Sequence, residues 1–102
     1  MINLIYISSA TSTPEEKDLI ELLEQARSRN DRQNVTGLLL YHKSKYLQVL
    51  EGARKDVYEI YDAIVKDTRN MGVLKLLDKE IVERSFPNWS MGFKNLNSFQ
   101  PE

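Results

Sequence analysis

The sequence has 102 residues, with 14 lysines and arginines against 15 aspartates and glutamates, a net charge of -1 and no cysteine. That length suits one domain with a modest core, and the near-neutral charge gives no global attraction to nucleic acid or anionic lipid. The absence of cysteine excludes disulfides and thiolate zinc sites, and the single histidine, His42, excludes a histidine-rich metal site.

Membrane and export signals are not found in the sequence. No apolar run approaches the ~20 residues that cross a bilayer, and the first six residues lack the basic head of a secretory signal. We therefore expect a cytoplasmic protein with no membrane partner.

The first half of the chain predicts a strand, a helix and a hairpin. Residues 2–8 form a strand that is apolar on both faces. Thr13, Pro14 and Glu16 predict a capped helix start, and apolar residues at helical spacing continue this helix to about Asn30. The hairpin follows, and its strands cover residues 35–41 and 46–51, joined by a tight turn over 42–45.

The second half predicts another helix and two further strands. Val57, Ile60 and Ile64 mark the apolar stripe of the helix, and the polar run 67–72 ends it. The rest of the chain predicts a fourth strand over 73–77 and 81–83, interrupted around residues 78–79, a turn over 85–88, and a short fifth strand over 89–93.

This order of elements predicts an α+β fold. It is ferredoxin-like, βαββαβ with an additional C-terminal strand, and has a mixed, mostly antiparallel sheet with two helices on one face. We expect the domain to cover residues 1–94 and a C-terminal tail to cover residues 95–102.

Gln48 is the polar exception in the third predicted strand. Alternation places it on one face with Tyr46 and Leu50, where an amide buried without a partner costs roughly 1–3 kcal/mol. It is either satisfied within the protein or meets a polar ligand. If the first and third strands are neighbours, Tyr6 and Gln48 meet on the helix-facing side, in a slot that suits a planar heterocycle.

Other residues have both a structural and a functional interpretation. Asn30 either caps the first helix or reaches the same slot, and Arg69 is either solvated or holds a phosphate. Trp89 and Met91 are expected on one face of the last strand, as core or interface residues.

The chain resembles the BLUF family of blue-light sensors that use flavin. The resemblance covers residues 2–94 and is carried by the motifs Leu4-Ile5-Tyr6-Ile7-Ser8, Ala26-Arg27 with Asn30, Val35-Thr36-Gly37-Leu38-Leu39-Leu40-Tyr41, Leu47-Gln48-Val49-Leu50-Glu51-Gly52, Asp67 with Arg69, and Phe86 with Trp89-Ser90-Met91.

This resemblance implies a non-covalently bound flavin, usually FAD and sometimes FMN, between the two helices. The implied cofactor-binding residues are Tyr6, Arg29, Asn30, Gln48, Asp67, Arg69 and Asn70. Arg29 stands where the family often has Asn or His, and Asn70 stands where His is frequent. These two departures affect the phosphate contacts and the preference for FAD over FMN.

The resemblance also implies a photosensory domain rather than an enzyme. Tyr6 matches the family's electron and proton donor, and Gln48 matches the glutamine that rearranges. Trp89 and Met91 match the positions that shift when the signal passes to a downstream protein or fused effector. Homo-oligomerisation is left open.

Three other functions compete with this one. An acylphosphatase-like hydrolase needs an arginine-containing phosphate loop, which residues 8–12 lack. An RRM-type RNA-binding sheet needs exposed aromatic residues and a basic surface, which the charge disfavours. A cofactor-free interaction domain is the third alternative.

Overall fold

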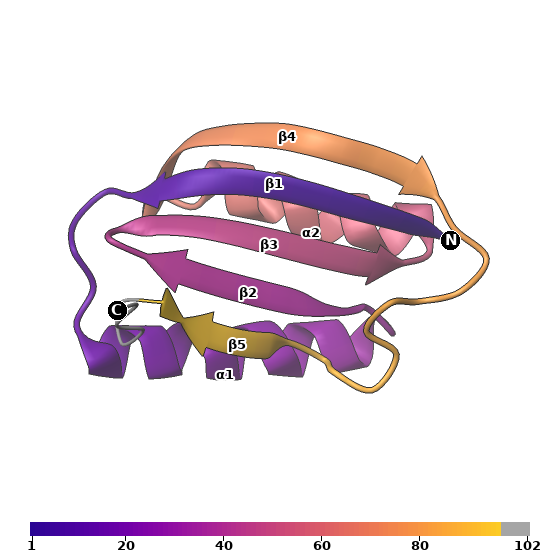
Figure 1. Cartoon of the computed structure of the whole chain (residues 1–102), viewed down its shortest axis with the longest axis horizontal. Coiled ribbons are helices and arrows are strands. Elements are labelled where there is room, and N and C mark those ends of the chain that lie inside the picture. The colour runs from indigo at the N-terminus through magenta and orange to yellow at the C-terminus, as the bar shows by residue number, and fades with distance from the viewer. Residues whose placement is uncertain (97–102) are drawn as a thin grey trace, which may run out of the picture.

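The computed structural model describes residues 1–96 and confirms the predicted α+β fold (Figure 1). The elements in chain order are β1 (Ile2–Ala10), α1 (Glu16–Arg32), β2 (Thr36–His42), β3 (Lys45–Gly52), α2 (Arg54–Lys66), β4 (Asn70–Glu80) and β5 (Gly92–Asn95). Most of the predicted tail, residues 97–102 of 95–102, lies outside the described residues. Within residues 1–96, no helix is long and apolar enough to cross a membrane.

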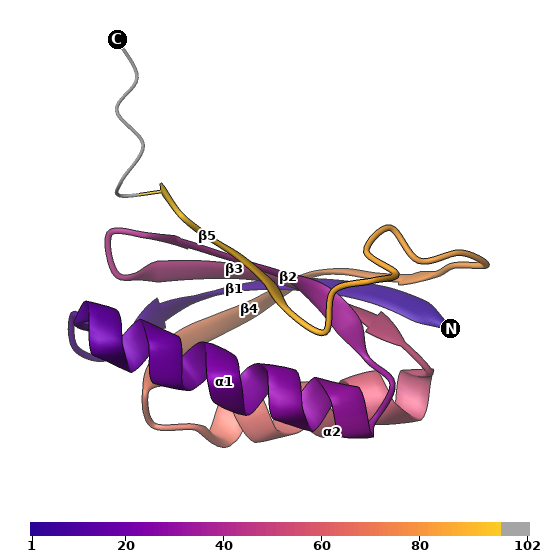
Figure 2. The ribbon, with the colours of Figure 1, turned by 90° about the horizontal axis from the view of Figure 1, so that it is seen from below.

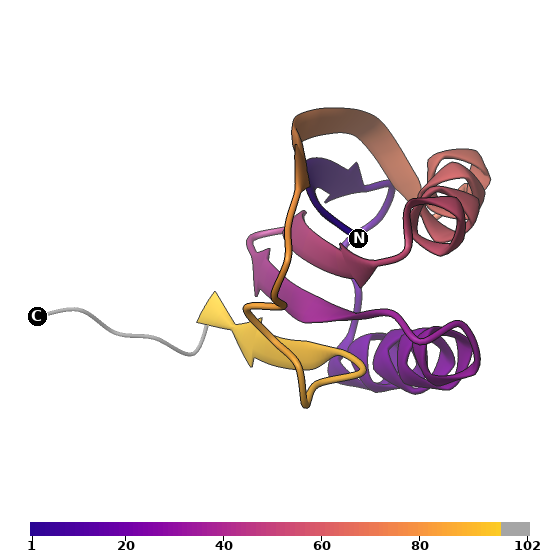
Figure 3. The ribbon, with the colours of Figure 1, turned by 90° about the vertical axis from the view of Figure 1, so that its right-hand side faces the viewer.

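The five strands form one sheet in the order β4-β1-β3-β2-β5. β5 runs parallel to β2, whereas the other neighbouring pairs are antiparallel. Both helices cover the same face, as Figures 2 and 3 show. The core therefore lies between this face and the helices, and it includes the helix-facing residues Leu4, Tyr6 and Leu50.

The β2–β3 hairpin has the tight turn that the sequence predicts. Its two central residues, Lys43 and Ser44, have φ values of 46° and 64°. Positive φ at both positions matches the right-handed twist of the flanking strands. This turn fixes the register that places Leu39 opposite Gln48.

Helix α1 begins later than predicted. Its N-cap is Glu15 rather than Thr13, and the Glu15 N–H donates to the Asp18 carboxylate at 2.9 Å. The Thr13 hydroxyl lies 3.1 Å from the Ser44 hydroxyl instead. The prediction was wrong by two residues because the sequence offers two overlapping capping-box patterns, Thr13 with Glu16 and Glu15 with Asp18, and the second one forms.

Strand β4 is continuous, so the predicted interruption at residues 78–79 was wrong. Asp78 pairs with Leu4 of β1 and its carboxylate accepts from Arg54 of α2 at 2.8 Å and 3.1 Å. An edge strand tolerates such charges because one side faces solvent. Residues 81–83, predicted as strand, have left the sheet.

Strand β5 begins at Gly92, whereas the sequence predicts a strand over 89–93. Residues 89–91 precede the β2–β5 ladder, and their carbonyls have partners outside it: the Gly37 N–H of β2 donates to Trp89 O at 3.0 Å, for example. The expected shared face of Trp89 and Met91 was also wrong, because Trp89 is 50% exposed and Met91 only 2%.

Gly37 lets β2 and β3 approach closely, which gives a test of the fold. A Cβ there would lie 1.9 Å from Val49 O. Gly37→Ala is expected to lower the free energy of unfolding by about 3 kcal/mol, at the upper end of overpacking costs. Gly72→Ala is the control, because its Cβ meets nothing within 4 Å and its φ of +61° costs about 1 kcal/mol. Equal losses for the two variants in urea denaturation would contradict this packing.

Candidate functional site

Tyr6 and Gln48 meet across neighbouring strands. They are directly opposite in the β1–β3 register, and both are 3% exposed. The Tyr6 hydroxyl donates a short hydrogen bond to Gln48 Oε1. The predicted contact between these two side chains is therefore present on the helix-facing side of the sheet.

The other end of the Gln48 amide faces a much weaker partner. Its Nε2 donates to Met91 Sδ at 3.5 Å, and a thioether sulfur is a weak acceptor. One end of the amide is thus held firmly by a phenol, and the other end loosely by sulfur.

Burial controls the protonation of Tyr6. Loss of solvation raises the pKa of its hydroxyl well above the ordinary value of 10.0, and the nearby positive charge of Arg29 opposes this shift. The phenol, neutral near pH 7 like any tyrosine, therefore stays protonated further into the alkaline range. It has a proton to donate, and Gln48 Oε1 accepts it.

A small cavity lies beside this pair, between the sheet and the two helices. Its volume is about 50 Å³. The lining combines polar side chains with apolar ones from both helices and the sheet, and comprises Tyr6, Leu22, Gln25, Ala26, Arg29, Leu39, Tyr46, Gln48, Ile64, Asp67, Arg69 and Asn70. The structure thus gathers six of the seven predicted cofactor-binding residues around one space.

Asn30 is the predicted residue that does not line this cavity. It is fully buried, and its Nδ2 donates to Ser90 O at 2.7 Å. Its Oδ1 accepts from Arg29 Nε at 3.5 Å. Asn30 therefore links α1 to the segment before β5, beside the site rather than within the lining.

The solvent-facing end of the cavity is charged. Arg69 holds Asp67 through several nitrogen–oxygen contacts, the shortest 2.6 Å, and these hydrogen bonds lower the pKa of the Asp67 carboxyl. Arg69 also donates to Gln25 Oε1 at 3.2 Å. Asn70 Oδ1 accepts from Ser8 Oγ at 3.4 Å. A cation and an amide thus stand at this end of the cavity.

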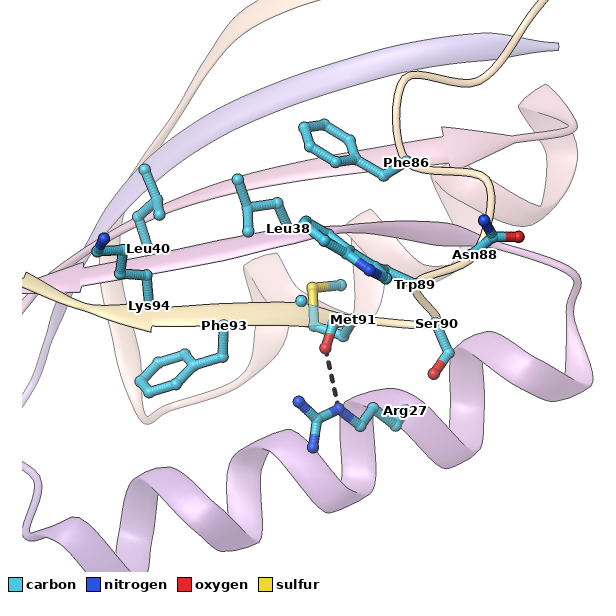
Figure 4. A pocket seen from close by; sticks show the side chains of 11 residues that line it. Arg27, Leu38, Leu40, Phe86, Asn88, Trp89, Ser90, Met91, Phe93 and Lys94 are labelled. Carbon is cyan, nitrogen blue, oxygen red and sulfur yellow. Dashed lines mark hydrogen bonds between the residues drawn. The ribbon is translucent and has the colours of Figure 1, made fainter.

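Trp89 and Met91 take different places. Met91 is inside, in contact with Gln48, whereas Trp89 lies outside and stacks on Phe86 with ring centroids 5.6 Å apart. Both line a wider groove of about 660 Å³ beside β5, which Figure 4 shows. This groove does not include Tyr6 or Gln48.

Sequence reasoning gave no role to two residues near the site. The Glu51 carboxylate is fully buried and accepts from the backbone N–H groups of Ser85 and Phe86 at 3.0 Å and 2.8 Å. Arg27 donates to Met91 O at 2.9 Å. A charge within an apolar strand could have identified Glu51, and the spacing of three residues from Asn30 places Arg27 on the same helix face.

The comparison with protein families identifies this architecture. The family model for BLUF, described as sensors of blue-light using FAD, matches residues 1–92. The chain belongs to the BLUF family. Its site therefore belongs to a flavin-dependent blue-light sensor, which decides against the hydrolase, the RNA-binding sheet and the cofactor-free domain.

Two curated relatives are much longer than this chain. Photoactivated adenylate cyclase subunit beta of Euglena longa is 33% identical over 89% of this chain, which spans 11% of that protein. The blue light- and temperature-regulated antirepressor BluF of Escherichia coli is 36% identical over 76% of this chain and 19% of the relative. In both relatives the BLUF part is a small fraction of the protein.

Solved BLUF structures share the fold closely. A bacterial light-regulated adenylyl cyclase has a TM-score of 0.92 and 34% identity over 96% of this chain and 29% of its own. The dark-state structure of the BLUF protein BlrB has a TM-score of 0.89 and 30% identity, and the match covers 94% of this chain and 73% of BlrB. Klebsiella pneumoniae BlrP1, with FMN and cyclic diGMP, has a TM-score of 0.89 and 29% identity, and the match covers 97% of this chain and 27% of BlrP1.

The residues fit a flavin in chemistry, but the cavity must enlarge. Apolar walls, a buried phenol–amide pair and a charged outer end suit a ligand with a planar ring and an anionic tail. A volume of about 50 Å³ holds about one or two water molecules rather than three fused rings. Leu22 and Arg29 are the half-buried helix residues of the lining, so entry of the ring requires them to move outward.

The burial of Tyr6 gives an alkaline titration test. Subtracting the phenolate absorbance of Tyr6→Phe from that of the wild type isolates Tyr6 among the five tyrosines. The difference should remain near zero beyond pH 10, because burial raises the pKa of Tyr6. The folded state holds this proton more tightly than the unfolded state, so the stability contribution is complete below pH 10 and is lost as pH rises above it. A Tyr6 midpoint at pH 10 would contradict the buried hydrogen bond.

Proposed function

We propose that this domain senses blue light through FAD, with Tyr6 and Gln48 as the photoactive pair. The proposal rests above all on their hydrogen bond beside a cavity enclosed by both helices. FMN is the alternative cofactor. We propose no reaction on a substrate, and the cytoplasmic location stays a prediction.

Residues at the solvent-facing end of the cavity and on α1 would hold the cofactor. Arg69 and Asn70 would meet its ribityl and phosphate groups, with Asp67 orienting Arg69. Arg29 would lie along the ring once it has moved outward, and Asn30 would bind a polar ring edge. Burial lowers the pKa of the Arg29 guanidinium. An outward move of this half-buried cation would therefore reduce the desolvation cost of Arg29 and make room for a neutral ring.

The bound flavin supplies absorption of blue light and an acceptor for one electron. On illumination Tyr6 would give up one electron, and its hydroxyl proton, then strongly acidic, would pass to Gln48 Oε1, which accepts that hydroxyl's hydrogen bond. Return of an electron and a proton to the Tyr6 oxygen would then restore the phenol, so that no net charge is transferred. Burial prevents water from competing for the proton.

The unequal partners of Gln48 make the amide a two-state element. In the described state the Tyr6 hydroxyl holds Oε1, while Nε2 has only Met91 Sδ. With its proton passed to Oε1, the phenol would no longer be the donor in this contact, and the sulfur contact is too weak to prevent rotation of the amide. Rotation or tautomerisation of the amide is therefore the lasting change, and Met91 lies in position to detect it.

The output would be a change in the segment 89–95 that a partner reads. The part that matches this chain is a small fraction of both curated relatives, which supports an effector that is fused or separate. Self-association of the domain is a further part of this proposal that an oligomer measurement in light and dark would test.

Tyr6→Phe tests the donor. The purified wild type should carry FAD, identified after release, and show a red-shifted light-minus-dark band that decays in the dark. The variant should keep the flavin and lose the shift by at least tenfold, because a phenyl ring has no proton to give. Tyr41→Phe is a matched control, since this buried tyrosine accepts from Ser44 N–H and lies outside the cavity lining. A full shift in Tyr6→Phe would remove Tyr6 from the mechanism.

Gln48→Leu tests the switch. Leucine has similar bulk but no amide, so flavin binding should persist while no long-lived red-shifted state forms. Transient absorption should still detect oxidation of Tyr6 followed by direct recovery. A variant that cycles like the wild type would assign the switch to another residue.

A further inference from the structure

Three successive carbonyls before β5 are held from outside the strand ladder. Gly37 N–H donates to Trp89 O at 3.0 Å, Asn30 Nδ2 to Ser90 O at 2.7 Å and Arg27 Nε to Met91 O at 2.9 Å. The contact with Arg27 is visible in Figure 4. Two of the three donors come from one face of α1, because residues three apart in a helix lie side by side.

Arg27 holds the backbone of the residue whose side chain contacts the switch. Met91 Sδ lies 3.5 Å from Gln48 Nε2, while the Met91 carbonyl accepts from Arg27. Methionine is unbranched and flexible and adapts to irregular spaces, so its own side-chain preferences do not fix the sulfur. The backbone anchor therefore determines whether the sulfur stays against the amide.

The same anchor affects Trp89, two residues earlier. Its indole is half exposed and stacks on Phe86. It also lies over Gly92, where a Cβ would come within 2.5 Å of the ring. A shift of the Met91 backbone would move Gly92 and thus remove one support of the outward indole.

A separate anchor holds the start of this segment. The Glu51 carboxylate binds the N–H groups of residues 85 and 86. Arg84 donates to Thr36 Oγ1 and Glu51 O at 2.8 Å each and to Asn34 O at 2.7 Å. Loss of Arg27 would therefore free the Met91 carbonyl and leave residues 84–86 in place.

We propose that Arg27 is a positioning residue of the photosensor: its guanidinium fixes Met91 against the Gln48 amide and keeps Trp89 at the surface. The inference rests on the proposed function for its effect on the photocycle, but its geometric part does not depend on light. Arg27 acts through Met91, since its side chain donates to the Met91 carbonyl and is not part of the cavity lining.

The test compares Arg27→Met with Arg27→Lys and Arg32→Met in the flavin-loaded protein. Arg32→Met removes the same charge at the last residue of α1 and serves as the control. Arg27→Lys keeps a donor and should rescue part of the effect. Thermal unfolding of all variants checks that they are folded, and Arg27→Gln replaces Arg27→Met if that variant does not fold.

Two readouts report position in the dark. The chain has one tryptophan and three methionines, and Arg27→Met adds a fourth. Met1, Met71 and position 27 are exposed whereas Met91 is buried, so the Met91 methyl signal is separable by labelling with ¹³C-methyl methionine. Arg27→Met should shift or broaden this signal and reduce acrylamide quenching of Trp89, as the indole becomes less exposed. A structural role alone would lower the unfolding temperature without moving these two signals.

The third readout is the dark-recovery rate. We expect Arg27→Met to change it by about three- to tenfold, the range given by one hydrogen bond of ordinary strength, while the red shift itself remains. Unchanged Met91 signal, quenching and recovery would overturn the proposal. A wild type that shows no light-induced shift would overturn the proposed function instead, and the methyl and quenching data would still test whether Arg27 positions Met91.

Discussion

The antiparallel pairing of β1 with β3 sets a phenol and a carboxamide directly opposite each other, and the site is built around that contact. The register Tyr6↔Gln48 places both side chains on the helix-facing side, because side chains alternate along a strand with a period of two. A shift of one residue in either strand would turn that strand's side chain to the other face. The photochemical contact thus depends on the same geometry that buries Leu4 and Leu50.

Around this contact, the protein combines one strong constraint with several weaker ones. The sheet fixes the Cα positions of Tyr6 and Gln48, and burial keeps the phenol neutral. By contrast, the amide nitrogen has only the Met91 sulfur, which belongs to a segment outside the strand ladder. A rigid donor and a loosely held amide suit a sensor, because the chemistry starts from fixed geometry while the product state can differ by one rotation.

Sequence reasoning was most successful where the backbone pattern determines the answer. Strand alternation, with the first and third strands taken as neighbours, predicted the meeting of Tyr6 with Gln48, and helical spacing predicted both helices. It failed for residues 89–91, which have partners on α1 and β2 instead of a ladder. No local pattern specifies such long-range bonds, so the inward Met91 and outward Trp89 could not be derived from the sequence. The narrow cavity was equally invisible, since it depends on how Leu22 and Arg29 pack.

The hydrogen-bonding capacities of methionine and tryptophan explain why Met91 is inside in the described state. Gln48 presents its N–H group toward this position, and a thioether can accept, whereas an indole N–H can only donate. With the amide turned by half a rotation, Oε1 would face the same position, where Met91 has no proton to offer and an indole N–H would. The orientation of one amide therefore determines which of two neighbouring side chains is the better partner. Trp89 lies two residues from Met91 with half of its surface in solvent, so an exchange of the two would require movement only of the segment that Arg27 and Asn30 hold.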